Sequence, residues 1–347
     1  YYCWEGAYVW EALTANNGGV IDPWLAKSWE HNDDCTEWTF NLRDDAYFTD
    51  GVQFNADVCL KNIERWGHGI TSTYTTLSIE KSLPNLDKME KVDDFTVKFT
   101  FTQPITTLEY VLSDYGSPMY SPNCFDEETG VISDYAIGTG PYKITDHVES
   151  EYVTLERNDN YYGEKGKVKT FKIRCIPDAE TRVSALKSGE VMGLADNGAI
   201  TMDAAKNLCD TDSSFEMDST PSHMTEYIMF NDKNEYLADK RMREAFNLAT
   251  DRDSICSVIY GGLLQPAYSF LSTQSTFHLD IQGTYDMEQA KALAKEVLGD
   301  KTVDMTMIIR SSTASDYNCK AVAEYLKQVY AELGVNINIE IVDSSLY

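Results

Sequence analysis

The chain has 347 residues, of which 43% are hydrophobic and 24% charged, and its formal net charge is −27. It is longer than the roughly 250–300 residues that one hydrophobic core supports, so we expect two or three structural units. The strong negative charge excludes binding to a nucleic-acid backbone and to an anionic membrane surface, because both need a surface rich in lysine and arginine.

The N-terminal part of the chain shows the pattern of short strands that pair with their neighbours. Residues 36–43 alternate apolar and polar side chains, which is typical of a strand with one buried face. Asn32-Asp33-Asp34, just before them, has the composition of a turn. We therefore predict an antiparallel hairpin between residues 24–30 and 38–43.

A helix and a second hairpin are predicted next. Asn55 is placed to cap a helix over residues 56–66. After Asp93-Asp94, every second residue from Phe95 to Phe101 is apolar, which indicates a further strand in an antiparallel pair. This stretch is thus predicted to be α+β.

From about residue 140 the predicted elements become longer. Residues 152–157 and 168–176 have strand-like patterns. Pro177-Asp178 then begins a helix that continues to Lys187 and ends at Gly189.

Three more helices are predicted from capping residues that precede apolar residues at helical spacing. The first has apolar side chains at i, i+3, i+4 and i+7 from Met242. The third has a glutamine three residues after its cap, as in a capping box. The predicted caps are Asp239, Asp251 and Asp286.

The end of the chain has the clearest pattern. Residues 303–309 and 335–341 alternate as strands, and residues 315–333 between them form an amphipathic helix closed by Gly334. The two strands are predicted to run parallel with a right-handed crossover, as in an α/β lobe. The last strand stops at Tyr347, so we expect this lobe to be incomplete.

The sequence contains no motif of a catalytic or metal centre. Its closest cysteines in the chain, Cys35 and Cys59, are 24 positions apart (59 − 35), and there is no CxxC pair, so we expect no zinc site. The cysteines are predicted to be mostly free and to pack as small hydrophobic residues, for example Cys175 and Cys256. One disulfide bond among them is the alternative that the sequence leaves open. GxSxG and HExxH are absent, so we expect neither an enzyme nor a cofactor.

One glycine-rich stretch is similar to a phosphate-binding loop. Gly138-Thr139-Gly140-Pro141 lacks a third glycine, and the residues after it lead into a predicted strand, whereas a phosphate loop leads into a helix. We predict that it is a structural turn.

Many segments, in order along the chain, resemble the family of extracellular solute-binding proteins that serve peptide and nickel ABC importers. The resemblance covers nearly the whole chain. The segments that carry it include Pro23–Glu30, Trp38–Asp45, Phe54–Val58, Ile137–Tyr142, Glu156–Asn158, Tyr161–Gly163, Ile176–Arg182, Phe230-Asn231, Arg241–Asn247, Asp251-Arg252, Tyr260–Gly262 and Tyr285-Asp286.

This resemblance implies an α/β, bilobed periplasmic-binding-protein-like fold (type II, cluster C) with an additional α+β subdomain. It places lobe I in residues 1–22 and 145–228 and the inserted subdomain in residues 23–144. Residues 229–347 are expected to form lobe II, incomplete at its C-terminal end. Members of the family extend beyond this chain at both ends.

The resemblance leaves two classes of ligand open. Residues 23–29 and 42–45 are most similar to the nickel-binding branch, which holds a metal-bound organic chelator with arginines in its cleft. Residues 69–77 and 112–122, which we align with the loops that carry those arginines, contain none. A peptide and a nickel or other metal chelate are therefore both expected ligands.

Five residues are candidates for the ligand site. Arg310 lies where the predicted strand 303–309 ends, and ligands of α/β folds bind beyond such strand ends, so Arg310 is placed to hold a carboxylate; a surface ion pair is the alternative. Tyr347 ends the neighbouring strand and, after Ser344-Ser345, matches a cleft tyrosine of the nickel-binding branch. Alignment with the family adds Trp4, Cys3 and Tyr115, for which core packing is the alternative.

The resemblance implies a solute-binding component of an ABC importer. Such a protein captures its ligand between two lobes, delivers it to a membrane permease and works as a monomer. It acts outside the cytoplasm, in the periplasm or on the outer face of the membrane, with a lipid anchor in the full-length protein. A peptide-binding sensor or chaperone without transport and a two-domain peptide hydrolase are the alternatives.

Overall fold

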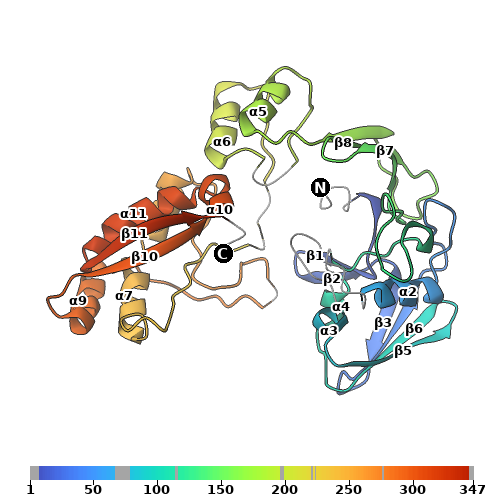
Figure 1. Ribbon diagram of the computed structural model, residues 1–347, viewed down its shortest axis with the longest axis horizontal. Helices are drawn as coiled ribbons and strands as arrows, with labels where there is room; N and C mark the ends of the chain where they lie inside the picture. The colour runs from blue at the N-terminus through green and yellow to red at the C-terminus, as the bar shows by residue number, and fades with distance from the viewer. Residues whose placement is uncertain are drawn as a thin grey trace. The chain divides into compact units, whose positions relative to one another are not determined.

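The computed structural model describes residues 8–66, 79–113, 116–195, 199–219, 222, 224–275 and 277–343. The chain divides into two compact units, unit 1 with residues Tyr1–Ile176 and unit 2 with residues Pro177–Tyr347 (Figure 1). The finer division into lobe I, an inserted subdomain and lobe II stays a prediction.

A four-stranded antiparallel sheet is the largest sheet in the described part of unit 1. Its strand order is β3-β4-β6-β5, and it contains both predicted hairpins, β3 with β4 and β5 with β6. Trp38 and Phe40 of β4 lie opposite Phe99 and Val97 of β6, so large side chains cover one face. The bounds are Ala26–His31 for β3, Glu37–Leu42 for β4, Leu86–Asp93 for β5 and Thr96–Phe101 for β6.

Helix α2 (Ala56–Trp66) packs against this sheet. Asn55 caps the helix as predicted, since its side-chain oxygen accepts a hydrogen bond of 3.0 Å from the Val58 amide. The apolar face of α2, with Ile63 and Trp66 fully buried, joins the aromatic side chains of the sheet in one core. The remaining short elements around this core are β1 (Thr14–Asn17), β2 (Val20–Pro23), α3 (Ile79–Ser82), α4 (Leu108–Val111) and η1 (Pro122–Cys124).

A second sheet of unit 1 has the order β7-β8-β9 and is antiparallel throughout. Its bounds are β7 (Tyr142–Val148), β8 (Tyr152–Arg157) and β9 (Thr170–Arg174). The strand predicted at 152–157 is confirmed, and the one predicted at 168–176 is shorter. Val9 is fully buried against the inner face of this sheet, so the N-terminal segment from Tyr8 is part of its core.

Unit 2 is rich in helices that begin at the predicted caps. Asp178, Asp239, Asp251 and Asp286 each accept a hydrogen bond from a backbone amide in the first turn of a helix. A side-chain acceptor at this position satisfies one of the amides that a helix start leaves without a partner. The helices are α5 (Ala179–Lys187), α6 (Met202–Thr211), α7 (Lys240–Ala249), α8 (Arg252–Ser254), η2 (Ile255–Ile259) and α9 (Met287–Leu298).

The C-terminal strands β10 (Val303–Arg310) and β11 (Val335–Val342) pair in parallel, as predicted, with Val303 opposite Val335. Their core is shared with helices α7, α9 and α11 (Cys319–Ala331), and the four residues at helical spacing from Met242 are all buried. Among the described residues, no helix is both long and apolar enough to cross a bilayer.

The helix predicted over residues 315–333 is confirmed as α11 (Cys319–Ala331), but its predicted start is wrong. A separate short helix, α10 (Ser311–Asp316), precedes it. Between them Asn318 has a φ of +54°, the left-handed conformation that ends a helix. Asparagine adopts this conformation more readily than most residues, and the apolar pattern on either side gave no sign of it.

Candidate functional site

Of the predicted ligand-binding residues, the structure describes Arg310. It is the last residue of β10, lies opposite Val342 of β11 and is exposed. The Thr313 hydroxyl donates a hydrogen bond of 3.2 Å to the Arg310 carbonyl as the chain turns into α10. The predicted place of Arg310 at the carboxyl end of a parallel strand is therefore confirmed, whereas its role toward a ligand stays a prediction. Tyr347, Trp4, Cys3 and Tyr115 lie outside the described residues.

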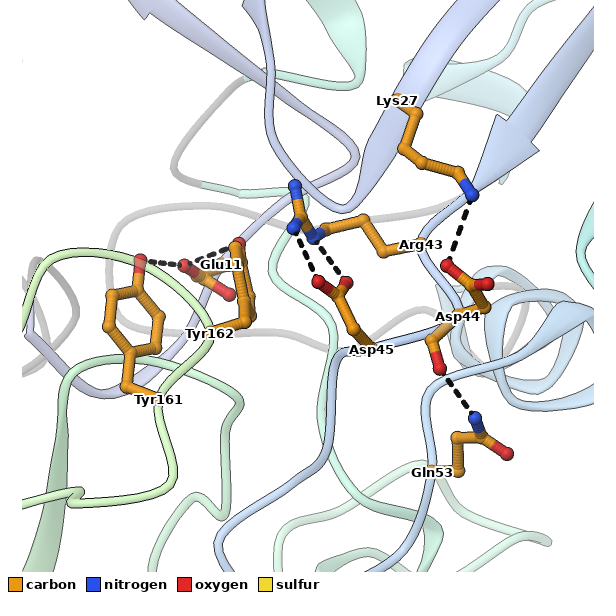
Figure 2. A network of polar contacts seen from close by, with 8 residues as sticks. All are labelled: Glu11, Lys27, Arg43, Asp44, Asp45, Gln53, Tyr161 and Tyr162. Atoms are coloured by element: carbon orange, nitrogen blue, oxygen red, sulfur yellow. Dashed lines mark hydrogen bonds and ion pairs between the residues drawn. The ribbon is translucent and has the colours of Figure 1, made fainter.

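Unit 1 contains a buried carboxylate that is not among the residues predicted from the sequence. Glu11 is fully buried, and its two side-chain oxygens accept four hydrogen bonds, of which Figure 2 shows the two from Tyr161 and Tyr162. Oε1 accepts from the indole Nε1 of Trp24 at 2.6 Å and from the hydroxyls of Tyr161 and Tyr162 at 2.7 and 2.9 Å. Oε2 accepts from the hydroxyl of Thr139 at 2.7 Å. We call Glu11 and these four donors the Glu11 cluster.

The turn that carries Thr139 approaches the Glu11 segment too closely for any side chain between them. A Cβ atom on Gly138 would lie 2.0 Å from the carbonyl oxygen of Val9, and one on Gly140 would lie 2.7 Å from the carbonyl oxygen of Tyr8. The Gly140 amide donates a hydrogen bond of 2.9 Å to the Val9 carbonyl. The turn leads directly into β7, so the prediction of a structural turn is confirmed, and its glycines serve backbone contact.

The hydrogen bonds of the cluster fit an ionised Glu11. A carboxylate only accepts hydrogen bonds, and four neutral donors surround it, whereas a protonated acid would have to donate one. Burial raises the pKa of Glu11 above its ordinary value, and the hydrogen bonds from Tyr161, Thr139, Tyr162 and Trp24 oppose this rise. Burial and the nearby Glu11 charge raise the pKa of both tyrosines, so their hydroxyls remain donors at neutral pH.

The guanidinium group of Arg43 lies over the face of the Tyr162 ring. The guanidinium carbon of Arg43 is 3.9 Å from the centroid of the Tyr162 ring. The same guanidinium group binds Asp45 through two hydrogen bonds of 2.9 Å, Nε to Oδ1 and Nη2 to Oδ2 (Figure 2). The Tyr162 ring is thus polarised by a cation on its face and by an anion at its hydroxyl.

The backbone of Glu11 holds a further part of unit 1. The Met119 amide donates a hydrogen bond of 2.8 Å to the Glu11 carbonyl, and the two residues form an isolated antiparallel bridge. The side chain and the backbone of Glu11 therefore connect the N-terminal segment, which begins at Tyr8, with several distant parts of the chain.

Unit 1 also has a pocket of about 450 Å³. It is lined by Tyr47, Phe48, Thr49, Asp50, Gly51, Asn158 and Asn160, most of them polar. It contains none of the predicted ligand-binding residues.

The next features are the possible metal ligands and the cysteine thiols in the part of the chain that the structure describes. No three His, Cys, Asp or Glu side chains gather there in a way that would hold a metal ion. The thiols of Cys59 and Cys124 are buried as small core residues, and burial raises the pKa of Cys59 to about 12, which makes it unreactive. Cys175 and Cys256, which we expected to be buried, are only partly so.

The sequence contains one signal that could have pointed to Glu11. Glu11 is the single charged residue in the run Tyr8-Val9-Trp10-Glu11-Ala12-Leu13. A lone acid inside an apolar stretch is rarely buried without partners. The partners themselves were not predictable, because Thr139 and Tyr162 follow Glu11 by 128 and 151 positions.

Comparison with solved structures gives the class of fold. The chain superimposes with a TM-score of 0.82 on NikA from Brucella suis in complex with Fe(III)-EDTA, at 22% identity, over 99% of this chain and 71% of that one. It superimposes with a TM-score of 0.76 on the periplasmic binding protein DppA from Helicobacter pylori in complex with the peptide STSA, at 24% identity, over 98% and 69%. The fold is that of the bilobed periplasmic binding proteins, as the sequence predicted.

Residues 20–347 match the family described as "Bacterial extracellular solute-binding proteins, family 5 Middle". The chain belongs to this family. It is 25% identical over 326 residues to the glutathione-binding protein GsiB of Escherichia coli strain K12, a match that covers 92% of this chain. The chain spans 61% of the length of that relative.

Proposed function

We propose that this protein is the solute-binding component of an ABC importer. It captures a peptide or a nickel or other metal chelate in a cleft between two lobes and delivers it unchanged to a membrane permease. The observation that carries the proposal is family membership along residues 20–347. It is supported by the ligands of similar proteins, which are a peptide in DppA, a metal chelate in NikA and, by its name, glutathione in GsiB.

Other features of the proposal follow from the same membership. The protein acts outside the cytoplasm, as a monomer and without catalysis. Lobe I (1–22 and 145–228), the inserted subdomain (23–144) and lobe II (229–347) are the proposed parts. Ligand binding shifts the balance between an open and a closed form, because the closed form binds the ligand more tightly.

Arg310 is the proposed carboxylate-binding residue of unit 2, and Tyr347 is proposed to contribute as well. Peptides, glutathione and organic chelators all carry carboxylates, which a guanidinium group binds with two parallel hydrogen bonds. The position of Arg310 at the carboxyl end of a parallel strand pair supports this role. Trp4, Cys3 and Tyr115 are proposed to contribute from unit 1.

The experiment is a binding titration of the intact protein by calorimetry with three probes: glutathione, the peptide Ser-Thr-Ser-Ala and a Ni(II)–histidine chelate. We expect at least one probe to bind and to be recovered unaltered after long incubation. Binding of none would contradict the proposal, and cleavage of the peptide would show a hydrolase instead.

A matched pair of variants tests Arg310. R310A is expected to weaken the binding of whichever probe the wild type binds by about 1.5–3 kcal/mol, the range for hydrogen bonds to a charged group. K327A removes a positive charge from an exposed residue of α11 and serves as the control. Equal affinities of R310A and K327A would exclude Arg310 from the ligand site.

A further inference from the structure

We propose that the positively charged stretch around the start of β9 is a docking surface for an acidic segment of a partner protein. Its lysines are Lys165, Lys167, Lys169 and Lys172, and we call them the lysine surface. Under the proposed function, the membrane permease is the protein that carries the acidic segment. The inference rests on the proposed function in this respect alone.

The first argument is the concentration of positive charge in an acidic chain. The chain has 56 acidic and 29 basic residues, yet residues 165–174 contain five basic residues and no acidic one. These five are the lysine surface and Arg174. All four residues of the lysine surface are exposed. Like charges repel one another, so such a cluster is unfavourable unless a counter-charge binds it.

The second argument is that the described part of the chain does not supply this counter-charge. Among the described residues, none of the four lysines forms an ion pair. The neighbouring acid Asp159 is already bound by Arg157 at 2.8 Å. The hydrogen bond from Arg157 is the main cause of the lowered pKa of Asp159, and Lys165 and Lys169 contribute least to it. The lysine surface is therefore available to a partner.

The third argument is that the loop before β9, which carries three of the lysines, is held through its backbone. The Arg157 guanidinium group donates a hydrogen bond of 3.1 Å to the Gly166 carbonyl. The Tyr142 hydroxyl donates one of 2.8 Å to the Val168 carbonyl, and the Arg157 amide donates one of 2.8 Å to the Lys169 carbonyl. Because backbone groups hold the loop, the lysine side chains remain free to bind, and a loop that is already fixed loses little entropy on binding.

Lys172 extends the lysine surface along β9. Its ammonium nitrogen lies 3.6 Å from the centroid of the Tyr152 ring on the adjacent strand β8. Within the described residues, β9 is an edge strand, the last in the order β7-β8-β9. Lysines on an edge strand also hinder pairing with other chains. That purpose does not explain the other three lysines, which precede β9.

The charge of the rest of the chain decides which kind of partner fits. An anionic membrane is an extended surface, so it would also repel the other acidic residues of a chain whose net charge is −27. A short segment rich in aspartate and glutamate contacts the lysine surface alone. It meets little of this repulsion, because charges are screened beyond about 8 Å at physiological ionic strength. Charge complementarity therefore favours an acidic protein segment over a membrane.

The test measures fluorescence anisotropy of a labelled peptide of alternating glutamate and serine, which serves as the acidic probe. The wild type is expected to bind this peptide at about 0.1 M salt and to lose binding at about 1 M, where the Debye length falls to ~3 Å. A peptide of alternating glutamine and serine has no charge to pair with the lysines and is expected not to bind.

Two triple variants with the same net charge locate the binding surface. K165Q/K167Q/K169Q is expected to bind the acidic probe about tenfold more weakly than the wild type, because it loses three exposed ion pairs that each contribute modestly. K233Q/K301Q/K327Q removes the same charge from exposed lysines of unit 2 and is expected to bind as the wild type does.

Equal affinities of the two triple variants would overturn the inference, as would no binding of the acidic probe to the wild type at about 0.1 M salt. Binding to phosphatidylglycerol vesicles without binding to the acidic probe would show a membrane contact and would overturn it as well. None of these outcomes involves the solute, so each leaves the proposed function standing. Failure of the wild type to bind glutathione, the peptide Ser-Thr-Ser-Ala or the Ni(II)–histidine chelate would refute the proposed function and leave the result with the acidic probe unaffected.

Discussion

Arg43 and Tyr162 lie 3.9 Å apart, measured from the guanidinium carbon to the ring centroid. The Tyr162 hydroxyl donates to the buried Glu11, so a partly exposed cation over the ring face and a buried anion at the hydroxyl act on one aromatic ring. A buried charge without a direct ion pair is unfavourable, and this arrangement offers Glu11 an indirect counter-charge.

The first prediction concerns this counter-charge. R43A is expected to lower the free energy of unfolding of unit 1 by about 1–2 kcal/mol, because it removes the cation from the ring and the packing of the arginine stem. All six tryptophans of the chain lie between residues 4 and 66, so tryptophan fluorescence during urea unfolding reports on unit 1.

The control is K27A. Lys27 pairs with Asp44 at 3.1 Å, but both side chains are about half exposed, so its removal is expected to change stability by less than ~1 kcal/mol. An R43A variant that unfolds at the same urea concentration as K27A would contradict a role of Arg43 in the cluster.

The second prediction concerns pH. Because burial raises the pKa of Glu11 above its ordinary value of 4.5, the folded protein binds this proton more tightly than the unfolded chain does. The protonated acid therefore contributes stability below pH 4.5, and this contribution is lost as the pH rises through the raised pKa of the folded state.

The E11Q variant has no titratable side chain at position 11. The difference in stability between the wild type and E11Q therefore isolates the titration of Glu11 from that of all other groups. The free energy of unfolding of the wild type, minus that of E11Q, is expected to fall between pH 4 and pH 7, measured by tryptophan fluorescence in urea at about six pH values. A difference that rises over this range would show that the four hydrogen bonds lower the pKa more than burial raises it.

The third prediction concerns the turn that faces Glu11. G138A would place a Cβ atom 2.0 Å from the Val9 carbonyl oxygen, so either the turn or the N-terminal segment has to move. We expect unit 1 to lose more than ~3 kcal/mol of stability, as is usual for substitutions that disrupt close backbone packing. G193A adds a Cβ that would meet nothing within 4 Å and is the control. Similar urea midpoints for G138A and the wild type would contradict the close approach.

The fourth prediction concerns the break between α10 and α11. Asn318 has a φ of +54°, where a residue with an ordinary side chain is strained by about 1–2 kcal/mol. N318A is therefore expected to reduce protection from hydrogen exchange in α11 by that amount, while N318G is expected to leave it within ~0.5 kcal/mol. Protection in N318A that equals or exceeds that in N318G would contradict the left-handed conformation, and greater protection in N318A is what one continuous helix would give, because alanine is more favourable than glycine inside a helix.

Local sequence patterns determined most of the individual elements. The helix over 56–66 with its Asn55 cap, the two hairpins of the larger sheet and the aspartate caps of unit 2 depend on residues that are near one another in the chain. The interactions that define them act over three or four residues in a helix or across a short turn, so their signal is present in a short window of sequence. The parallel pair β10 and β11 was predictable for a similar reason, because a strand, a helix and a strand in succession favour it.

The tertiary structure alone decided the Glu11 cluster and the end of α10. Glu11 meets Thr139 and Tyr162 only because the folded chain brings residues more than a hundred positions apart into contact. Hydrogen bonds of this kind have no spacing rule, since any polar residue at the right place in the fold would serve. Likewise, the left-handed conformation of Asn318 leaves the apolar pattern of the neighbouring turns unchanged, and that pattern was the only indication of a continuous helix. Burial and long-range hydrogen bonding are properties of the packed chain, so sequence patterns predict where elements form but not which distant side chains they bring together.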